Sequence, residues 1–227
     1  MSVAVMAQQQ SDEDAIRRVA DNILKQPVTQ FVGVKNKVVY ESTKDIPDGV
    51  EVNFNSPLTE WHYSNGVLDM ALINLGKYLN EQKYIDYAKN HVAFGFDNYK
   101  YFKSTFKNDR NHWHWPFGQL WNFKELDDCG AMGAAVIEVY EYVKRPEYKE
   151  YIENAASHIM TGQIRLEDGT LCRTFPHEMT VWADDAYMAT SFLTQMGKRS
   201  GKAANQHRSI FVVSRKATLL SLLLYRC

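Results

Sequence analysis

Apolar residues recur every three or four positions along much of the chain, which is the spacing of one face of an α-helix. The first such stretch begins at Ser11, which forms an imperfect capping box with Asp14. Short connections after the second and fourth stretches indicate antiparallel hairpins with the helices that follow. The pattern predicts helices over residues 11–24, 67–79, 84–94, 127–143, 148–159 and 184–196.

Two stretches between these helices break the pattern. Residues 26–57 alternate only loosely and contain the turn signals Pro47-Asp-Gly49 and Asn55-Ser-Pro57, so we expect a long, mostly irregular connection. Residues 98–123 are rich in tyrosine, phenylalanine and tryptophan and fit neither the helical nor the strand period. These rings either line a sugar-binding cleft or fill the core beneath a long loop, and the pattern favours neither interpretation.

The hairpins repeat along the chain. Tyr84 of one hairpin returns as Tyr148 of the next, and Trp61, Asp128 and Asp184 recur with a similar period of about sixty residues. In each unit, the residues that look functional stand at the start of the first helix. Hairpins of this kind curl into a ring with those helix starts on one face. The predicted fold class is therefore all-α, an α/α toroid.

Composition favours carbohydrate over nucleic acid as a ligand. Of the 227 residues, 45% are hydrophobic and 13% are aromatic, and a net charge of −1 offers little attraction for nucleic acid. The three cysteines, Cys129, Cys172 and Cys227, show neither a disulfide framework nor metal-ligand spacing. We therefore expect no metal ion and no cofactor.

Both ends of the chain differ from its middle. Ala4-Val-Met-Ala7 resembles the end of a signal peptide, so residues 1–10 are interpreted as its remnant and the protein as secreted or periplasmic, otherwise cytoplasmic. Residues 198–227 hold seven basic and no acidic residues, and we expect a tail from an aberrant reading frame that does not pack as native structure. Its apolar run is too short to span a membrane. Residues 11–197 then form the toroid domain.

Two pairs of adjacent acidic residues stand at predicted helix starts. Asp184 and Asp185 follow Trp182, and Asp127 and Asp128 open a helix of small and apolar residues. An ordinary explanation exists, because free N–H groups and the positive end of the helix dipole favour a carboxylate at a helix start. Two pairs at equivalent places of repeated units instead favour one shared cleft in which Asp184 carries the chemistry. Asp185, on this hypothesis, only caps its helix.

Three motifs carry a family resemblance: Trp61-His-Tyr-Ser-Asn-Gly66, Leu126-Asp-Asp-Cys-Gly-Ala-Met-Gly133 and Trp182-Ala-Asp-Asp-Ala-Tyr-Met188. They resemble the unsaturated rhamnogalacturonyl hydrolases of glycoside hydrolase family 105 and the related unsaturated glucuronyl hydrolases of family 88. The resemblance runs from about Ser11 to Gly197. It implies an (α/α)6 toroid of which this chain would hold only about the N-terminal half. We therefore expect the chain alone to be inactive and poorly soluble.

The resemblance also implies a glycosidase of pectin-type polysaccharide breakdown. Its oligosaccharide substrate ends in a 4,5-unsaturated galacturonyl or glucuronyl residue, whose double bond is hydrated. Asp184 is implied as the general acid and base, and Asp128, with Asp127 as the alternative, as the second carboxylate that holds the substrate or tunes the pKa of Asp184. The implied contacts with the sugar are Trp61, Tyr63, Asp127, His177 and Trp182.

Three alternatives stay open. His177 is equally typical of a surface histidine. A conventional two-carboxylate glycosidase predicts similar residues. A non-catalytic carbohydrate-binding or structural helical fragment would keep the aromatic residues without needing the acidic ones. A magnesium site like that of terpene cyclases is not expected, because Ala131 and Met188 stand where its Asp-Asp-x-x-Asp motif needs a third acidic residue.

Overall fold

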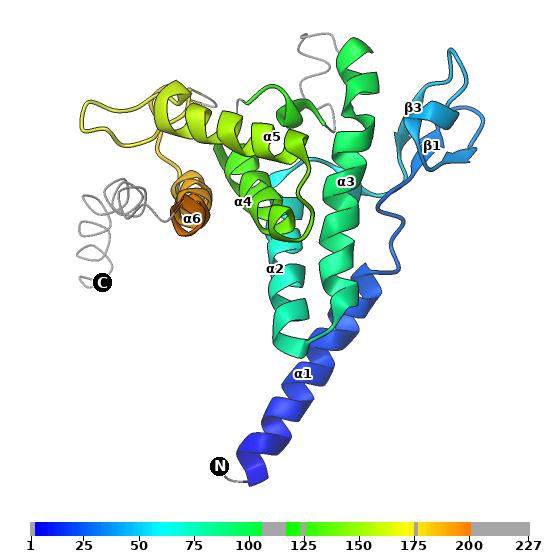
Figure 1. The fold of residues 1–227 in the computed structure, drawn as a ribbon, viewed down its shortest axis with the longest axis vertical. Coiled ribbons are helices and arrows are strands. Elements are labelled where there is room, and N and C mark those ends of the chain that lie inside the picture. Colours follow the sequence, from blue (N-terminus) through cyan, green and yellow to red (C-terminus); the bar gives the residue numbers. More distant parts are fainter. Residues whose placement is uncertain (1–2, 106–116, 124–125, 175–176, 201–227) are drawn as a thin grey trace.

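The computed structural model describes residues 3–105, 117–123, 126–174 and 177–200. This part of the chain is all-α, as the apolar pattern predicted, with one small sheet at its side (Figure 1). None of the helices described is long and apolar enough to cross a membrane. The α-helices are α1 Val3–Ile23, α2 Tyr63–Leu79, α3 Gln82–Thr105, α4 Leu126–Tyr142, α5 Pro146–Ser157 and α6 Ala183–Ser200.

Two helix hairpins, α2 with α3 and α4 with α5, form the centre of the structure (Figure 1). The chain reverses after α2 at Asn80, which adopts the left-handed conformation (φ 56°) and donates its N–H to the carbonyl of Gly76. α5 begins at Pro146, whose fixed φ suits the first position of a helix. Local sequence signals thus explain both reversals, and α6 begins the next unit of the partial toroid.

The first helices of the successive units are α2, α4 and α6, and we call them the leading helices. α4 packs directly against α2 and against α6. Glycines allow the close approach. A Cβ atom on Gly66 of α2 would lie 2.6 Å from the backbone of Ala131 in α4, and one on Gly130 of α4 would lie 2.8 Å from the backbone of Met188 in α6. No other residue fits such a distance, so these glycines let the helix backbones touch near their N-terminal ends.

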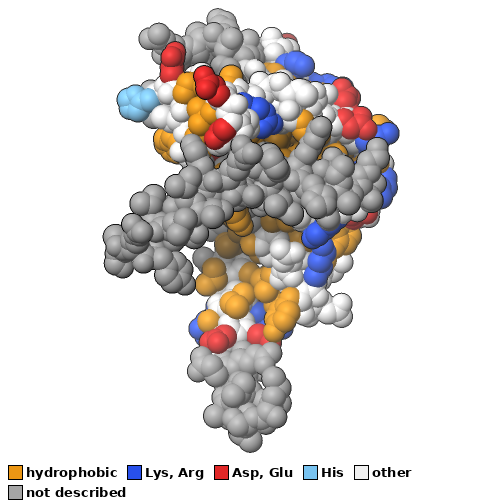
Figure 2. Space-filling model, turned by 90° about the vertical axis from the view of Figure 1, so that its left-hand side faces the viewer, with side chains coloured by type: hydrophobic (Ala, Val, Ile, Leu, Met, Phe, Trp, Pro, Cys, Tyr) orange, Lys and Arg blue, Asp and Glu red, His pale blue; other side chains and the backbone are white. Residues whose placement is uncertain are grey.

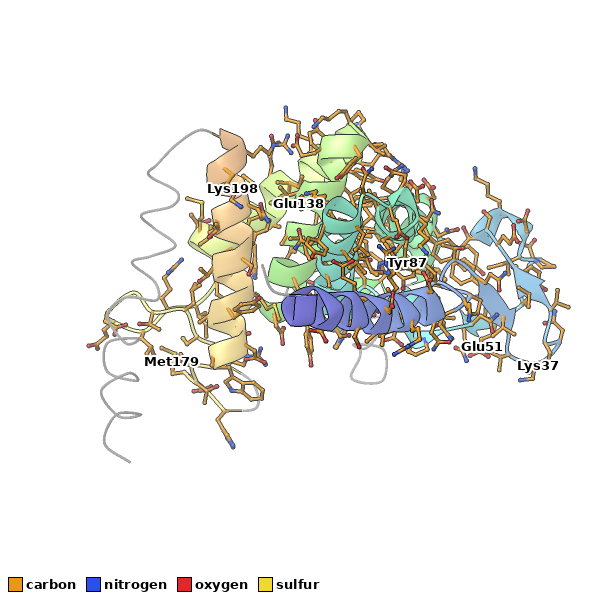
Figure 3. The ribbon with its side chains drawn as sticks, turned by 90° about the horizontal axis from the view of Figure 1, so that it is seen from below. Lys37, Glu51, Tyr87, Glu138, Met179 and Lys198 are labelled. Atoms are coloured by element: carbon orange, nitrogen blue, oxygen red, sulfur yellow. The ribbon has the colours of Figure 1, made fainter. Side chains whose placement is uncertain are left out.

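All three leading helices run in the same direction. The glycine contacts join their first two turns, whereas Lys77 of α2 forms a 2.5 Å ion pair with Glu138, four residues from the end of α4. The guanidinium of Arg199 in α6 lies 4.0 Å from the ring centroid of Tyr140, also near the end of α4. Lys198 and Glu138 lie toward the same ends of α6 and α4 (Figure 3). The N-terminal ends consequently gather on one face.

The repeated aromatic residues are core positions. Tyr84 of α3 and Tyr148 of α5, which the sequence repeat pairs, are both buried. Trp61 is only 2% exposed, and its indole N–H donates to the hydroxyl of Tyr151 at 3.1 Å. The sequence repeat therefore reflects equivalent core positions in the hairpins as well as equivalent positions of the motifs.

The connection between α1 and α2 contains a three-stranded antiparallel sheet that the pattern did not predict. β1 Phe31–Gly33 lies between β2 Val39–Tyr40 and β3 Val52–Phe54. Strands of two or three residues are too short to show a period of two. The ring of Phe31 lies 4.8 Å from that of Phe94 in α3, so the sheet is held by aromatic packing against this helix.

The aromatic stretch 98–123 is partly helix rather than loop. α3 continues to Thr105, and residues 106–116, with three of the rings, lie outside the described part of the chain. Phe102 and Phe117 are buried in the main core. For these two rings the core interpretation is correct, and a position in a sugar-binding cleft is not.

Both ends of the helical region extend beyond the predicted limits. α1 begins at Val3 rather than near Ser11, because no glycine or proline interrupts the residues between them, and Ser11 lies inside the helix instead of capping it. α6 continues through the predicted boundary at Lys198 to Ser200, and the rest of the basic tail lies outside the described residues. The interpretations of residues 1–10 and of the tail stay predictions.

An apolar groove of about 670 Å³ lies between α1 and α2. Val19 of α1 and Tyr78 of α2, which line it, are each 64% exposed. Hydrophobic side chains also gather in the lower half of the face shown in Figure 2. The described residues therefore leave part of the apolar surface of α2 uncovered.

Candidate functional site

The N-terminal ends of the leading helices bring the three sequence motifs to one face. Tyr63 is the first residue of α2, Asp127 and Asp128 are the second and third residues of α4, and Asp184 and Asp185 hold the same places in α6. Because the helices touch near these ends, motifs separated by about sixty residues in the sequence form one site.

Both acid pairs have the same local geometry. Asp127 Oδ1 accepts the N–H of Asp128, and Asp184 Oδ1 accepts the N–H of Asp185, each at 2.9 Å. The first carboxylate of each pair thus satisfies an N–H that has no partner within the helix. Helix capping therefore explains the hydrogen bond made by one oxygen of Asp127 and by one oxygen of Asp184. It does not explain why a second acidic residue, Asp128 or Asp185, follows in each pair.

Asp128 joins α4 to α2. Its Oδ1 accepts the backbone N–H of Tyr63 at 2.6 Å, and Nε2 of His62 lies 3.9 Å from the same oxygen. This N–H is the first of α2, so a carboxylate here also complements the positive end of the helix dipole. Asp128 is buried, whereas Tyr63 is 36% exposed. The carboxylate that the motif nominated is thus held by the backbone of Tyr63, a residue that is itself partly exposed.

Arg173 connects the two acid pairs. It lies on the segment between α5 and α6, where an antiparallel bridge pairs it with Thr180. Its Nε donates to Asp185 Oδ2 at 2.7 Å, and its Nη2 donates to Asp185 Oδ1 and, at 3.2 Å, to Asp127 Oδ2. The guanidinium thus binds Asp185 with two hydrogen bonds and reaches α4 with a third.

The ring of Trp182 covers this guanidinium. The central carbon of Arg173 lies 4.5 Å from the ring centroid, which is a cation–π distance. Trp182 nevertheless stays 40% exposed. Since one face of the indole lies against Arg173, a ligand has only the remaining exposed part of the ring to contact.

Burial and ion pairing act in opposite directions on Asp185. Burial raises its pKa, and the hydrogen bonds and charge of Arg173 oppose this, while the negative charges of Asp127 and Asp184 add to the rise. The hydrogen bonds that Arg173 donates to Asp185 raise the pKa of Arg173 further than burial lowers it, so the guanidinium stays charged. The two parallel bonds are those of an ionised carboxylate on an arginine. Asp185 therefore depends on Arg173 to carry its charge in this buried place.

A model of glycosyl hydrolase family 88 matches residues 34–210, well over half of the chain, and the match includes all three motifs. The chain belongs to glycosyl hydrolase family 88. None of the curated proteins compared with it matches. Membership of family 88 makes this a glycoside hydrolase domain whose substrate is an oligosaccharide, and the face where the three motifs meet is its candidate active site.

The predicted sugar contacts differ in whether they are exposed to a ligand. Tyr63 and Trp182 are partly exposed beside the acid pairs. Trp61 is enclosed in the core instead, where its indole N–H is bonded to Tyr151, so it supports the site without offering a face to a sugar. His177 is exposed on the segment before α6, and the hydrogen bond that involves it is accepted by its carbonyl. A role for its ring stays a prediction.

Two residues of the site were not nominated from the sequence. His62 stands within the first motif, but its proximity to Asp128 comes from the packing of α4 on α2. Arg173 lies outside all three motifs. A signal for it did exist, because two acid pairs on one face need a cation, and between residues 150 and 184 the only Lys or Arg residues are Arg165 and Arg173.

The described side chains of the candidate site include carboxylates that can carry chemistry. No group of three or more His, Cys, Asp or Glu residues in the described part of the chain is arranged to hold a metal ion. Cys129, next to Asp128, is buried, and burial raises the pKa of its thiol, so it is not a nucleophile. What the site offers is a half-buried Asp184, a fixed Asp128 and two accessible rings.

Proposed function

We propose that this family 88 chain hydrolyses unsaturated uronyl oligosaccharides, with the rhamnogalacturonyl substrates of the family 105 enzymes included. The observation that carries the proposal is the place of Asp184. It lies two residues after the exposed Trp182, is half-buried at the start of α6, and adjoins Asp185, whose charge is bound by Arg173. A carboxyl group between an aromatic ring and a buried anion suits proton transfer to a bound sugar.

The proposed reaction needs one group that both gives and takes a proton. The protonated carboxyl of Asp184 donates its proton to C4 of the double bond, and water adds at C5. The carboxylate left on Asp184 takes the proton that this water loses, so the residue ends the cycle protonated. The product carries a hydroxyl at C5 as a hemiketal, which opens and releases the neighbouring sugar. No metal or cofactor takes part in these steps.

The other residues hold the substrate. Asp128, fixed by the N–H of Tyr63, is proposed to accept hydrogen bonds from sugar hydroxyls, because a carboxylate with one fixed orientation positions a ligand well. The rings of Tyr63 and Trp182 are proposed to stack on the sugar. Arg173 is not assigned to the carboxylate of the substrate, because its charge is bound by Asp127 and Asp185.

The proposed setting is the breakdown of pectin-type polysaccharides after a lyase, since elimination by a lyase creates the unsaturated residue that this reaction consumes. A secreted or periplasmic location suits that setting. Support for the location comes from the small residues Ala4 and Ala7 alone.

Turnover of unsaturated disaccharides tests the proposal. Because residues 1–227 alone are expected to be inactive, it is measured on this chain completed with the second half of a family 88 toroid. Hydration removes the ultraviolet absorbance of the double bond, so its loss reports the reaction directly. Asp184→Asn should lower turnover at least about a hundredfold, the usual scale of general acid–base catalysis, and leave substrate binding within a few-fold. Asp48→Asn, in an exposed turn of the connection before α2, is the control and should change neither.

Three results would point elsewhere. Full activity of Asp184→Asn would remove this residue from its role. Binding of the disaccharide without any turnover by the completed protein would favour the non-catalytic carbohydrate-binding alternative. Cleavage of saturated glycosides at a similar rate would favour the conventional two-carboxylate mechanism.

A further inference from the structure

Arg173 bonds to both helices that carry acid pairs, and we propose that it is a positioning residue. By bonding Asp127 of α4 and Asp185 of α6 at once, it fixes the separation between Asp128 and Asp184. Arg173 itself does not touch the substrate. The kinetic part of this inference rests on the proposed function, and the structural part stands without it.

The acid pairs divide their tasks because of helix geometry. Adjacent residues of a helix point about 100° apart, so the two carboxylates of a pair cannot both turn to one partner. Arg173 binds Asp127 in the first pair and Asp185 in the second. Asp128 is the neighbour of Asp127 in the first turn of α4, and Asp184 is the neighbour of Asp185 in the first turn of α6. A single guanidinium therefore sets the relative position of both carboxylates that the proposed reaction uses.

An arginine suits this task because its guanidinium is a planar fork with fixed donor directions. Nε and Nη2 bind the two oxygens of Asp185, and Nη2 also reaches Asp127 at 3.2 Å. A lysine carries the same charge on one nitrogen and cannot reproduce the fork. Charge and geometry can therefore be varied separately at position 173.

Arg173 is also anchored to the start of α6. Its backbone N–H donates to the carbonyl of Thr180 at 3.0 Å, and its carbonyl accepts from the N–H of Thr180 at 3.2 Å. Trp182, the residue before α6, covers its guanidinium. With these contacts and the two bonds to Asp185, Arg173 moves with α6, so the bond to Asp127 is the link that ties α6 to α4.

Two variants separate positioning from simple charge compensation. Arg173→Lys keeps the charge and loses the fork. A triple variant with Arg173→Met, Asp127→Asn and Asp185→Asn removes all three charges together, and neutral replacement of a buried ionic group often leaves stability unchanged. A role in charge compensation alone predicts that both variants behave like the unmodified chain.

Arg145 provides a matched control in the same chain. It also bonds two carboxylates, Asp97 at 2.7 Å and Glu147 at 2.5 Å, and its guanidinium lies 5.0 Å from the ring centroid of Tyr148. Its partners belong to α3 and α5 rather than to the leading helices. The triple variant Arg145→Met, Asp97→Asn and Glu147→Gln therefore repeats the chemistry of the substitution away from the site.

Amide hydrogen exchange is the first measurement. In both Arg173 variants the first turns of α4 and α6 should exchange at least about tenfold faster, while the remaining helices keep their protection. The Arg145 control should leave these two turns unchanged. With an unsaturated disaccharide as substrate, kcat should fall at least about tenfold and KM should stay within about threefold, because the reacting groups are displaced while most contacts with the sugar remain.

The exchange result decides the inference by itself. Unchanged protection of both helix starts in Arg173→Lys overturns it, and so does a loss of protection spread evenly over the chain, which would mark a merely structural ion pair. If the triple variant does not fold, Arg173→Lys gives the answer alone. Absence of turnover by the protein completed with the second half of the toroid would count against the proposed function, and the exchange result would still decide the role of Arg173.

Discussion

The backbone N–H of Tyr63 donates to Oδ1 of Asp128 across 2.6 Å, so a carboxylate of the candidate active site also caps the neighbouring helix α2. One side chain thus serves the packing of two leading helices and the proposed binding of substrate. A substitution at Asp128 would ordinarily change both together. The hydrogen bond gives a way to separate them, because an amide can replace the carboxylate as acceptor without its charge.

Asp128→Asn should keep the hydrogen bond that caps α2 and should lower turnover. Asparagine is as good a cap as aspartate, so the unfolding free energy should change by no more than about 0.5 kcal/mol, whereas Asp128→Ala should lose about 1 kcal/mol. Both variants should lower turnover at least about tenfold. Urea denaturation and the absorbance assay measure the two effects. Equal stability of the two variants would show that the hydrogen bond to Tyr63 contributes little.

Asp185 does more than cap its helix, which is all that its position in the sequence indicated. It is 2% exposed and holds Arg173 with two hydrogen bonds. Asp185→Asn removes the negative charge that accepts two hydrogen bonds from the buried guanidinium, so we expect a loss of about 3 kcal/mol in the free energy of unfolding. Asp184→Asn, at the adjacent half-buried position, should lose about 0.5 kcal/mol or less. Denaturation of the two variants side by side tests whether Asp185→Asn loses more stability than Asp184→Asn. If Asp185 only capped its helix, Asp185→Asn would lose no more stability than Asp184→Asn.

The fold was accessible from the sequence where local signals and packing agree. The period of 3.6 located the leading helices, and Pro146 marked the start of α5. The repeat of Tyr84 at Tyr148 located equivalent core positions. These features succeed because a residue's face on a helix and its burial follow from its spacing to its neighbours.

What the sequence could not supply depends on contacts between distant residues. Arg173 acquires its role from Asp127, which is 3.2 Å away in space and far away along the chain. The family resemblance implied that Trp61 contacts the sugar, and only the packing of α5 shows that its indole is bonded to Tyr151. Spacing along one helix carries no information on such partners.

A buried pair, His91 of α3 and Asp69 of α2, should make stability depend on pH. Burial lowers the pKa of His91, but the charge of Asp69 and its hydrogen bond, 2.7 Å long, more than offset this, so the pKa is raised. The folded chain then binds the proton more tightly than the unfolded chain. The stabilisation is complete below about pH 6.5 and is lost as the pH rises through the folded pKa, by about 1.4 kcal/mol for each unit of the shift.

Urea denaturation between pH 6 and pH 9 measures this dependence, and Asp69→Asn is the variant to compare. Without the carboxylate, only backbone hydrogen bonds to Thr59 and Glu60 oppose the effect of burial on the pKa of His91, so the fall in stability over this range should become smaller. A flat profile for the unmodified chain, or an unchanged slope in Asp69→Asn, would contradict the assignment. Lys77→Gln, which removes an exposed ion pair between α2 and α4, should leave the slope as it is.

The groove between α1 and α2 should make the described chain associate with itself. An uncovered apolar surface on a soluble protein is a contact site for another molecule, and Val19 and Tyr78 each expose 64% of their surface there. Val19→Glu places a charge on this surface without removing a buried contact, so it should keep the free energy of unfolding within about 0.5 kcal/mol. It should also reduce association.

Val38→Glu is the control for this substitution, because Val38 is also an exposed valine, 47% exposed, but lies in the connection before β2 rather than in the groove. Sedimentation velocity at two protein concentrations should show a larger monomer fraction for Val19→Glu than for the unmodified chain or for Val38→Glu. The reason is that a charged side chain must lose its water to enter an apolar contact, which costs several kcal/mol unless a partner charge is present. Equal monomer fractions in all three proteins would show that the groove is not where the copies meet.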